Sequence, residues 1–205
     1  MRRKTAVIGL LFVVGCGWLL SSCGPGKSKT DAGPVVLEEE PPAEALATAQ
    51  ETAEALGNQV VAALFRELER GNPIEAIEVC AVAAQEMVAS YATEGITVRR
   101  VSRRVRNPAD KPDEYERVKL EELQGLHDQG SLPSETAEVV MENGAKRLRY
   151  LKPIVIKQPC LMCHGPVGQI DDEVLDTIHS RYPGDRAIGY EVDDLRGAIS
   201  VTIAL

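Results

Sequence analysis

Apolar residues recur at helical spacing over residues 43–70, and Gly71 follows where a helix C-cap belongs. This pattern predicts one long amphipathic helix near the start of the folded region. Asn72 and Pro73 then supply an N-cap and a proline for the first helical position, with Glu75 at the third. A second helix is therefore expected directly after the first.

Two further helices are indicated by their capping residues. Asp113 and Glu116 form a capping-box pattern that opens a helix ending near Gly130. Asp171 opens a shorter helix, which the Pro-Gly pair at 183–184 ends. Both would flank the rest of the fold.

Strand-like sequence occurs in four places, at residues 96–105, 137–141, 147–156 and 199–205. In the last of these, apolar residues alternate with Ser200, Thr202 and Ala204, which predicts a half-buried antiparallel strand in the middle of a sheet. The expected fold class is α+β, an antiparallel sheet with a long N-terminal helix and flanking helices.

The first residues have the organisation of an export signal. Arg2, Arg3 and Lys4 precede an apolar stretch at 6–20 that is too short to span a bilayer comfortably. Leu20-Ser21-Ser22-Cys23 resembles a lipobox, so we expect a lipoprotein signal peptide at residues 1–22 and acylation of Cys23. A plain secretory peptide cut nearby and an uncleaved anchor are the alternatives.

The expected organisation of the exported chain follows from this start. Residues 23–42 are rich in Gly, Pro and Glu and predict a flexible tether behind the acylated cysteine, and residues 43–205 predict one domain. The acyl chains would make the membrane a partner. We therefore expect a lipid anchor in a bacterial cell envelope, on the periplasmic side, and Gly24 favours the outer membrane over the inner.

Charge excludes one class of partner. The chain has 23 Lys+Arg and 31 Asp+Glu, a net charge of −8, and loss of three basic residues with the signal peptide leaves 20 against 31, or −11. An acidic protein of this kind repels nucleic acid, so no nucleic-acid partner is expected.

The most informative stretch is Cys160-Leu161-Met162-Cys163-His164, the attachment pattern of c-type haem. In that chemistry the two cysteines form thioethers with the vinyl groups, and the histidine binds the iron. The pattern occurs once, so one covalent haem c is expected. A zinc site would need a second Cys/His pair at ligand spacing, and the sequence supplies none.

Cys80 is the one cysteine without an assignment, because Cys16 leaves with the signal peptide and the others are acylated or bind haem. No disulfide is therefore available. Cys80 shares a helix face with Ile77, Ala84 and Met87. Two readings are open: Cys80 is a small buried core residue, or it is a second ligand to the haem iron.

An unusual group of arginines follows at positions 99, 100, 103, 104 and 106. Arginine forks hold carboxylates well, so Arg99 and Arg100 are candidates for binding the haem propionates. The alternative is that these arginines pair with the many surface acids.

Several stretches together resemble the exported, PAS-like, single c-type haem domains, the Tll-like haem-binding family, once catalogued as a domain of unknown function. They are Ala76 to Cys80, Val98 to Ser102, Arg106 to Ala109, Pro112-Asp113, Cys160 to Gly165, Ala187 to Tyr190 and Asp194 to Val201. The resemblance covers residues 45–205 and implies a PAS-like fold. Asp110 and Asp193 depart from it, where the family often has Asn and Gly.

The resemblance also implies a ligand set and a function. It implies haem with a histidine on one side and a cysteine on the other, which fall on His164 and Cys80, and it adds Arg196 to the propionate candidates. The expected function is a redox or diatomic-ligand responsive sensor module that signals to a redox or signalling protein partner. It is not expected to be an enzyme, although His127 or His179 would be the acid/base candidates of one.

The alternative function is a periplasmic monohaem electron-transfer cytochrome. Such a carrier would need a distal methionine, for which Met87 and Met141 are the candidates.

Overall fold

The computed structural model describes residues 33–205. The predicted signal peptide, Cys23 and the first part of the predicted tether lie outside the described residues. Among the helices in the described part, none combines the length and the apolar character that a membrane crossing needs.

Five strands form one antiparallel sheet in the order β1-β3-β4-β5-β2. The strands are β1 (Val35–Val36), β2 (Ile96–Val101), β3 (Thr136–Glu142), β4 (Ala145–Val155) and β5 (Leu195–Ala204). The predicted α+β class is confirmed, and the last strand does lie inside the sheet, antiparallel to both neighbours. The stretch after Val101, predicted as strand to residue 105, is a loop instead.

The edge strand β1 falls inside the stretch that was expected to be a flexible tether. Val35 and Val36 pair with Met141 and Val140, and the Leu37 N–H donates to the Val139 oxygen across 2.9 Å. Ordered structure thus begins before residue 43, because two valines can extend the sheet at its free edge.

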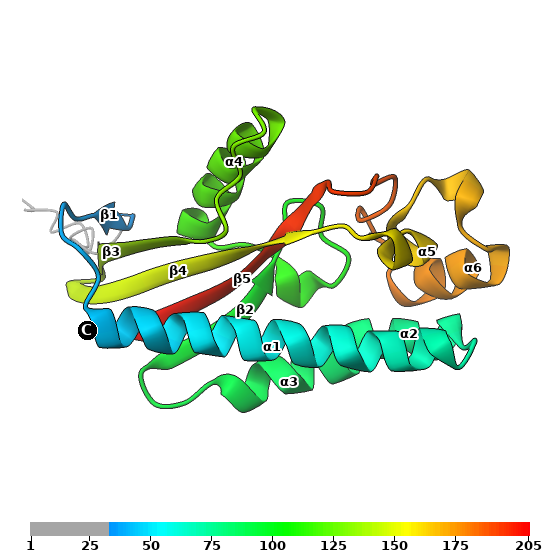
Figure 1. Ribbon diagram of the computed structural model, residues 1–205, viewed down its shortest axis with the longest axis horizontal. Helices are drawn as coiled ribbons and strands as arrows, with labels where there is room; N and C mark the ends of the chain where they lie inside the picture. Colours follow the sequence, from blue (N-terminus) through cyan, green and yellow to red (C-terminus); the bar gives the residue numbers. More distant parts are fainter. Residues whose placement is uncertain (1–32) are drawn as a thin grey trace, which may run out of the picture.

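The predicted long helix is α1 (Ala43–Glu69), and α2 (Pro73–Glu78) begins after a turn of three residues. Gly71 adopts a φ of 71°, the left-handed conformation of a C-cap, and the Asn72 side chain accepts from the Glu75 N–H. In α1, Ala49, Ala53 and Leu56 are fully buried and pack on one face of the sheet. Helix α3 (Ala84–Tyr91) lies beside α1 on the same face (Figure 1).

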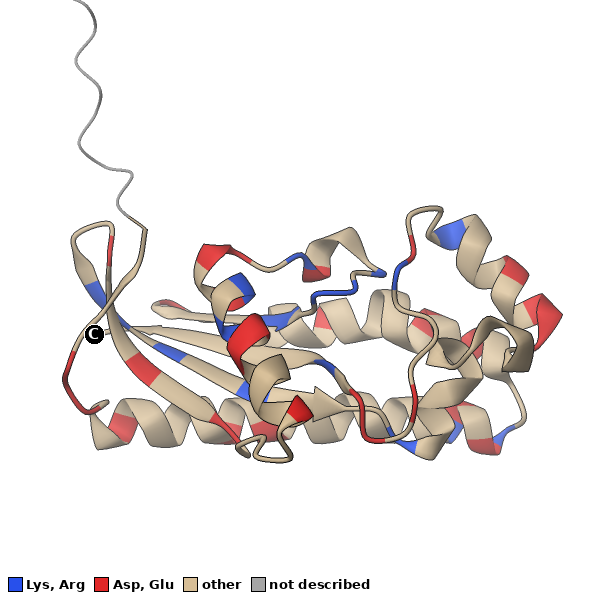
Figure 2. Cartoon of the chain, turned by 90° about the horizontal axis from the view of Figure 1, so that it is seen from above, with Lys and Arg blue, Asp and Glu red and all other residues tan. Residues whose placement is uncertain are grey.

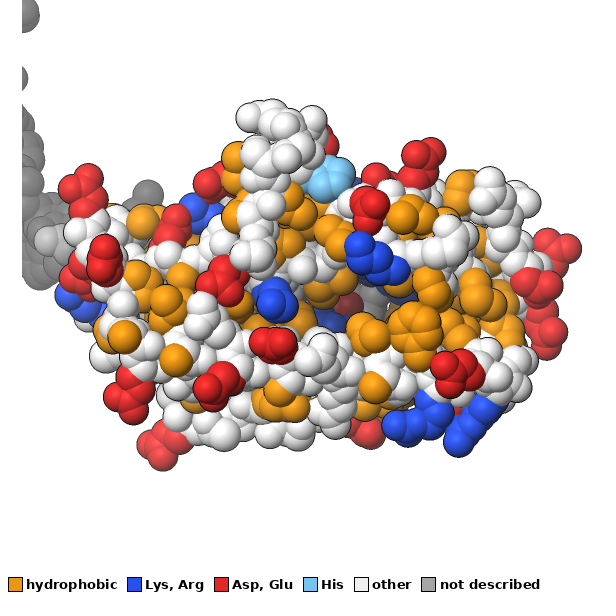
Figure 3. All heavy atoms as spheres, in the orientation of Figure 1, with side chains coloured by type: hydrophobic (Ala, Val, Ile, Leu, Met, Phe, Trp, Pro, Cys, Tyr) orange, Lys and Arg blue, Asp and Glu red, His pale blue; other side chains and the backbone are white. Residues whose placement is uncertain are grey.

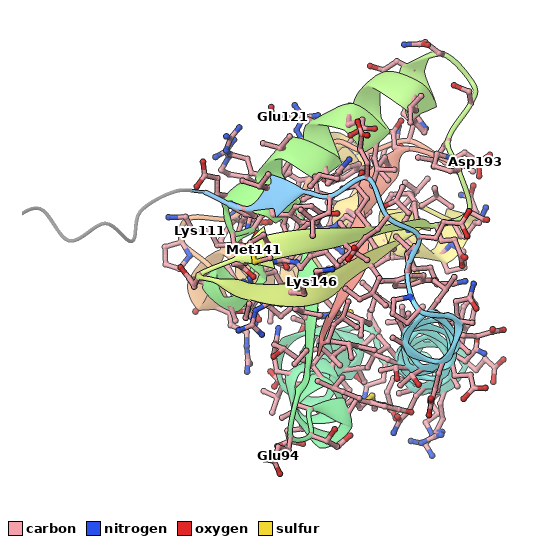
Figure 4. The ribbon with its side chains drawn as sticks, turned by 90° about the vertical axis from the view of Figure 1, so that its left-hand side faces the viewer. Glu94, Lys111, Glu121, Met141, Lys146 and Asp193 are labelled. Carbon is pink, nitrogen blue, oxygen red and sulfur yellow. The ribbon has the colours of Figure 1, made fainter. Side chains whose placement is uncertain are left out.

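Helix α4 (Glu114–Asp128) covers the other face, with the capping box of Asp113 and Glu116 that the sequence predicts. Figure 4 shows the sheet between α4 on one side and α1 with α3 on the other. Because helices cover both faces, β5 is buried on both. Even Ser200, expected on a polar face, is only 2% exposed.

Beyond one end of the sheet lie two small helices that carry the end of the chain back to β5. These are α5 (Leu161–His164), directly after β4, and α6 (Asp172–Arg181), which Asp171 caps as predicted. Val174 and Ile178 of α6 pack against Ile77 of α2. This end of the molecule therefore joins the CxxCH motif to the helix that leads to Cys80.

Candidate functional site

A cavity lies where the end of β4, the helices α1 and α2, the loop after β2 and the start of β5 meet. Figure 3 shows this face of the molecule hollowed near its middle, with hydrophobic side chains gathered beside the hollow toward the end that carries α5 and α6. The polar residues of the lining are Arg100, Ser102, Arg106, Asn107, Asp110, His164, Tyr182 and Arg196, and the cysteines are Cys80, Cys160 and Cys163. The residues predicted to bind the haem thus line one cavity, with the exception of Arg99.

The CxxCH motif is folded as a short 3-10 turn, η3 (Gln158–Cys160), followed by α5. The Lys157 N–H points at the Cys160 sulfur at 3.5 Å, and the Gly165 N–H donates to the Leu161 oxygen at 2.9 Å. A side chain on Gly165 would lie 2.6 Å from that same oxygen, so the tight turn after His164 requires glycine. Both cysteines and the histidine are thereby presented from one helical turn.

His164 is oriented by a backbone acceptor. Its Nδ1 lies 2.6 Å from the carbonyl oxygen of Ala187, and a carbonyl can only accept, so Nδ1 carries the hydrogen. Burial lowers the pKa of this imidazole well below its ordinary value, and Arg196 and Arg106 lower it further. The ring is therefore neutral with a lone pair on Nε2, which is the form that binds metals.

Cys80 lies in a π-helical turn, η1 (Val79–Ala83), between α2 and α3. Such turns insert one extra residue into a helix and occur often at functional sites. Two side chains from β2 and the loop after it donate hydrogen bonds to backbone carbonyls of this turn. Arg100 Nη2 donates to the Cys80 oxygen at 3.0 Å, and Asn107 Nδ2 donates to the Ala81 oxygen at 3.5 Å. The position of Cys80 therefore depends on β2 and the loop that follows it.

Both of the cysteines with a shifted pKa owe the shift to burial. Burial raises the pKa of the Cys80 thiol, and Arg100, Arg106 and Arg196 oppose that rise. Burial also raises the pKa of Cys163 to about 11. No disulfide links the described cysteines. The lining thus contains thiols beside cationic groups in an enclosure of low polarity.

The structure separates two adjacent arginines that sequence reasoning had grouped. Arg100 points to the cavity, and its Nη2 lies 3.5 Å from Asp110 Oδ2. Arg99 is not in the cavity lining, because neighbours in a strand face opposite sides of a sheet. It pairs instead with buried Glu116 at 2.7 Å.

Sequence reasoning missed Arg106 as a site residue. This arginine is 8% exposed, lines the cavity and donates to the Cys163 oxygen at 2.6 Å and to Asp185 at 2.9 Å. It lies in the loop after β2, where no periodicity indicates which way a side chain points. Its place in the Arg-Asn-Pro-Ala stretch was the one available signal.

The donor set fits a planar apolar group that carries carboxylates. One wall is apolar and comes from α1, where Gly57 lies so close to the sheet that an added Cβ would be 3.3 Å from Ile199 Cδ1. The lining also contains the positively charged guanidinium groups of Arg100, Arg106 and Arg196, whose forks suit carboxylates. Within residues 33–205, no group of three or more His, Cys, Asp or Glu side chains is arranged to hold a metal ion. A haem, which brings its own four nitrogen ligands, suits these residues better than a bare ion.

The other candidates lie elsewhere. Met87 packs against the core cluster under α1, and Met141 lies on β3 at the end of the molecule that Figure 4 views. His127 Nε2 bonds the Asp193 backbone oxygen at 2.9 Å, and His179 is exposed on α6. None of these four residues is in the lining of the cavity.

Comparison with known proteins gives one family and one solved structure. A family model described as Tll0287-like matches residues 39–204, and no curated protein matches the chain. The solved structure is the "Crystal structure of the cyanobacterial heme-protein Tll0287", which is 28% identical in sequence with a TM-score of 0.46. The match covers 58% of this chain and 66% of that chain, slightly less than two thirds of its length.

Proposed function

The chain belongs to the Tll0287-like family, and we propose on this basis that it is a haem-binding protein with one haem c attached through Cys160 and Cys163. The protein that gives the family its name is a cyanobacterial heme-protein by its title. The observation that carries the proposal is the cavity, in which the CxxCH motif, a second cysteine and three arginines share one apolar enclosure.

Each residue of the cavity has a role in this proposal. When bound, haem supplies an iron centre that exchanges one electron and can bind a diatomic ligand. His164 offers the lone pair of Nε2, and the Ala187 carbonyl keeps the ring in position. Cys80 offers its sulfur from a separate element, η1. Arg100, Arg106 and Arg196 would bind the propionates, and we no longer include Arg99, which is engaged with Glu116.

The ligand set favours a responsive module over a simple carrier or an enzyme. A cysteine in a π turn sits on a locally irregular backbone, which is a suitable place for a ligand that binds in one state and leaves in another. An electron carrier with a distal methionine is less well supported, because neither Met87 nor Met141 lines the cavity. We therefore propose a redox or diatomic-ligand responsive sensor.

The proposal includes a location and a partner. A lipid on Cys23 would hold the domain on the periplasmic face of a bacterial membrane, through a tether that ends at β1. A change at the haem would then pass to a separate redox or signalling protein.

Low-temperature EPR of the purified ferric protein tests the ligand set. We expect a low-spin signal with the narrow spread of thiolate ligation, lost in Cys80→Ala and unchanged in Met87→Leu, a matched control from the adjoining helix. Mass spectrometry of the same samples checks the covalent haem. A signal that is indifferent to Cys80→Ala but altered by Met87→Leu would reject the sensor ligand set and favour the electron carrier.

A further inference from the structure

A second cavity of about 300 Å³ shares part of its lining with the first and is rich in arginine. Its lining comes from the loop after β2, from α4, from the loop between α6 and β5 and from the start of β5. The residues are Arg103, Arg104, Leu120, Gln124, Arg186, Tyr190, Asp194, Leu195, Arg196 and Gly197. Only Arg196 and Gly197 line both cavities, so the two are separate spaces with one short strand segment between them.

The four arginines of this cavity differ from most others in the protein. Eight of the thirteen arginines in residues 33–205 form a salt bridge with a carboxylate. Within the same residues, the five that form none are Arg66, Arg103, Arg104, Arg186 and Arg196, and all but Arg66 line this one cavity. In a chain with more acids than bases, this concentration of uncompensated positive charge is a local property of the cavity.

The arginines are held together by the backbone and by an aromatic ring rather than by acids. Arg104 Nε donates to the Arg186 oxygen at 3.1 Å, and the Arg186 N–H donates to the Val105 oxygen at 3.0 Å, so the two loops are joined. Figure 2 shows basic stretches of these loops next to each other in the middle of the molecule. The Arg104 guanidinium stacks on the buried Tyr190 ring, 4.0 Å from its centre.

The polar groups already present leave the positive charge available. Arg196 Nη1 donates to Ser102 Oγ and to the Arg104 oxygen, both of them uncharged acceptors. The single acid in the lining is Asp194, whose Oδ2 accepts from the Glu191 N–H at 2.7 Å and forms no salt bridge within 4 Å in the described part of the chain. Arg103 and Arg186 are exposed, so an ion can reach them from solvent.

We infer that this cavity is a binding site for a free oxyanion of the phosphate or sulfate class, distinct from the site proposed for the haem. Planar arginine forks on three chain segments match the tetrahedral oxygens of such an ion with charge-assisted hydrogen bonds. Because one ion would contact Arg103 and Arg104 of one loop and Arg186 of the other, binding would tie the two loops together. The inference does not rest on haem binding, since three of the four arginines are absent from the first cavity.

Calorimetric titration of the full, haem-loaded protein with inorganic phosphate at constant ionic strength tests this site. We expect one saturable site per chain and at least tenfold weaker binding in Arg186→Gln and in Arg103→Gln. Arg66→Gln is the matched control and should change nothing, because Arg66 is the one arginine of residues 33–205 that lies outside the cavity and forms no salt bridge. Thermal unfolding of each variant checks that the fold is retained.

Arginines also bind the propionates of haem. A second experiment therefore distinguishes a free oxyanion from the haem propionates as the ligand of this cavity. The titration is repeated on the Cys160→Ser/Cys163→Ser variant, which lacks the attachment sulfurs. Saturable phosphate binding in both proteins supports a separate oxyanion site. Binding in the variant alone, absence of saturable binding in the loaded protein, or indifference to Arg186→Gln would each overturn it. If the proposed haem attachment is wrong, the absorption spectrum of the unmodified protein will show no covalent haem. The phosphate titration still tests the oxyanion site in that case.

Discussion

His164 and Arg106 donate hydrogen bonds to the same backbone oxygen, that of Ala187, at 2.6 Å and 3.3 Å. Arg106 also donates to the Cys163 oxygen, so one guanidinium contacts both the CxxCH turn and the carbonyl that orients His164. The ion pair with Asp185 completes this arrangement, with the two side chains only 8% and 1% exposed. The geometry of His164 therefore depends on a residue in a distant loop.

Replacing Arg106 by Met should destabilise the protein strongly. The change leaves Asp185 buried without its partner, and losses of this kind are typically about 3–5 kcal/mol. Arg117→Met is the control, because the Arg117–Glu121 pair is more than half exposed and should contribute at most about 0.5 kcal/mol. Urea unfolding of both variants measures the difference, and equal losses would show that burial of the Arg106 pair has no special importance.

Much of the fold follows from local sequence. The caps at Asn72, Asp113 and Asp171 and the left-handed glycine at 71 set helix boundaries that the structure reproduces, because capping is decided within one turn. The hairpin between β3 and β4 also had a local signal that went unused. Asn143 and Gly144 have φ of 52° and 79°, as an Asn-Gly turn between two strands requires.

The remainder depends on tertiary pairing. The register of β2 against β5 decides whether Arg99 or Arg100 faces the cavity, and the local sequence of β2 does not determine that register. The π turn at Cys80 and the direction of Arg106 in its loop are likewise settled by packing. Sequence therefore identifies the CxxCH motif and the residue types of the cavity, while the structure decides which arginines line it.

Two glycines should respond in opposite ways to replacement by alanine. At Gly197 a Cβ would lie 2.2 Å from the Val101 oxygen, so Gly197→Ala forces β5 and β2 apart and should cost about 1–3 kcal/mol. Gly125 lies within α4, and apart from the backbone of its own helix no atom lies within 4 Å of an added Cβ, so Gly125→Ala should stabilise by about 0.5–1 kcal/mol. Thermal unfolding gives the two signs, and destabilisation by both would contradict the packing described here.

The stability of the protein should fall as pH rises through the pKa of His127. The bond to the Asp193 oxygen, with help from Asp128 and Asp194, raises the pKa of this imidazole above its ordinary value. A raised folded-state pKa means that the contribution is complete below about pH 6.5, the unfolded value, and is lost above the folded one.

The comparison that isolates this effect is His127→Gln, in which Gln124 and the acids around the ring are unchanged. Its free energy of unfolding should differ most from that of the unmodified protein near pH 5.5 and least near pH 8.5. Denaturant titrations across this range supply the measurement. A difference that is independent of pH would mean that His127 contributes by packing alone.

Occupancy of the arginine cavity should alter the haem, because Arg196 lines both cavities. An anion beside Arg196 offsets positive charge near the iron, which stabilises the oxidised state, so phosphate should lower the midpoint potential relative to chloride at equal ionic strength. Linkage requires the reciprocal effect: the oxidised protein must bind phosphate more tightly than the reduced protein, by the factor that the potential shift specifies.

Spectroelectrochemical titration with and without phosphate measures the midpoint potential, and calorimetry on both oxidation states measures the affinity for phosphate. Arg186→Gln should abolish both effects while Arg66→Gln keeps them, and a phosphate-induced shift that persists in Arg186→Gln would locate its origin outside this cavity.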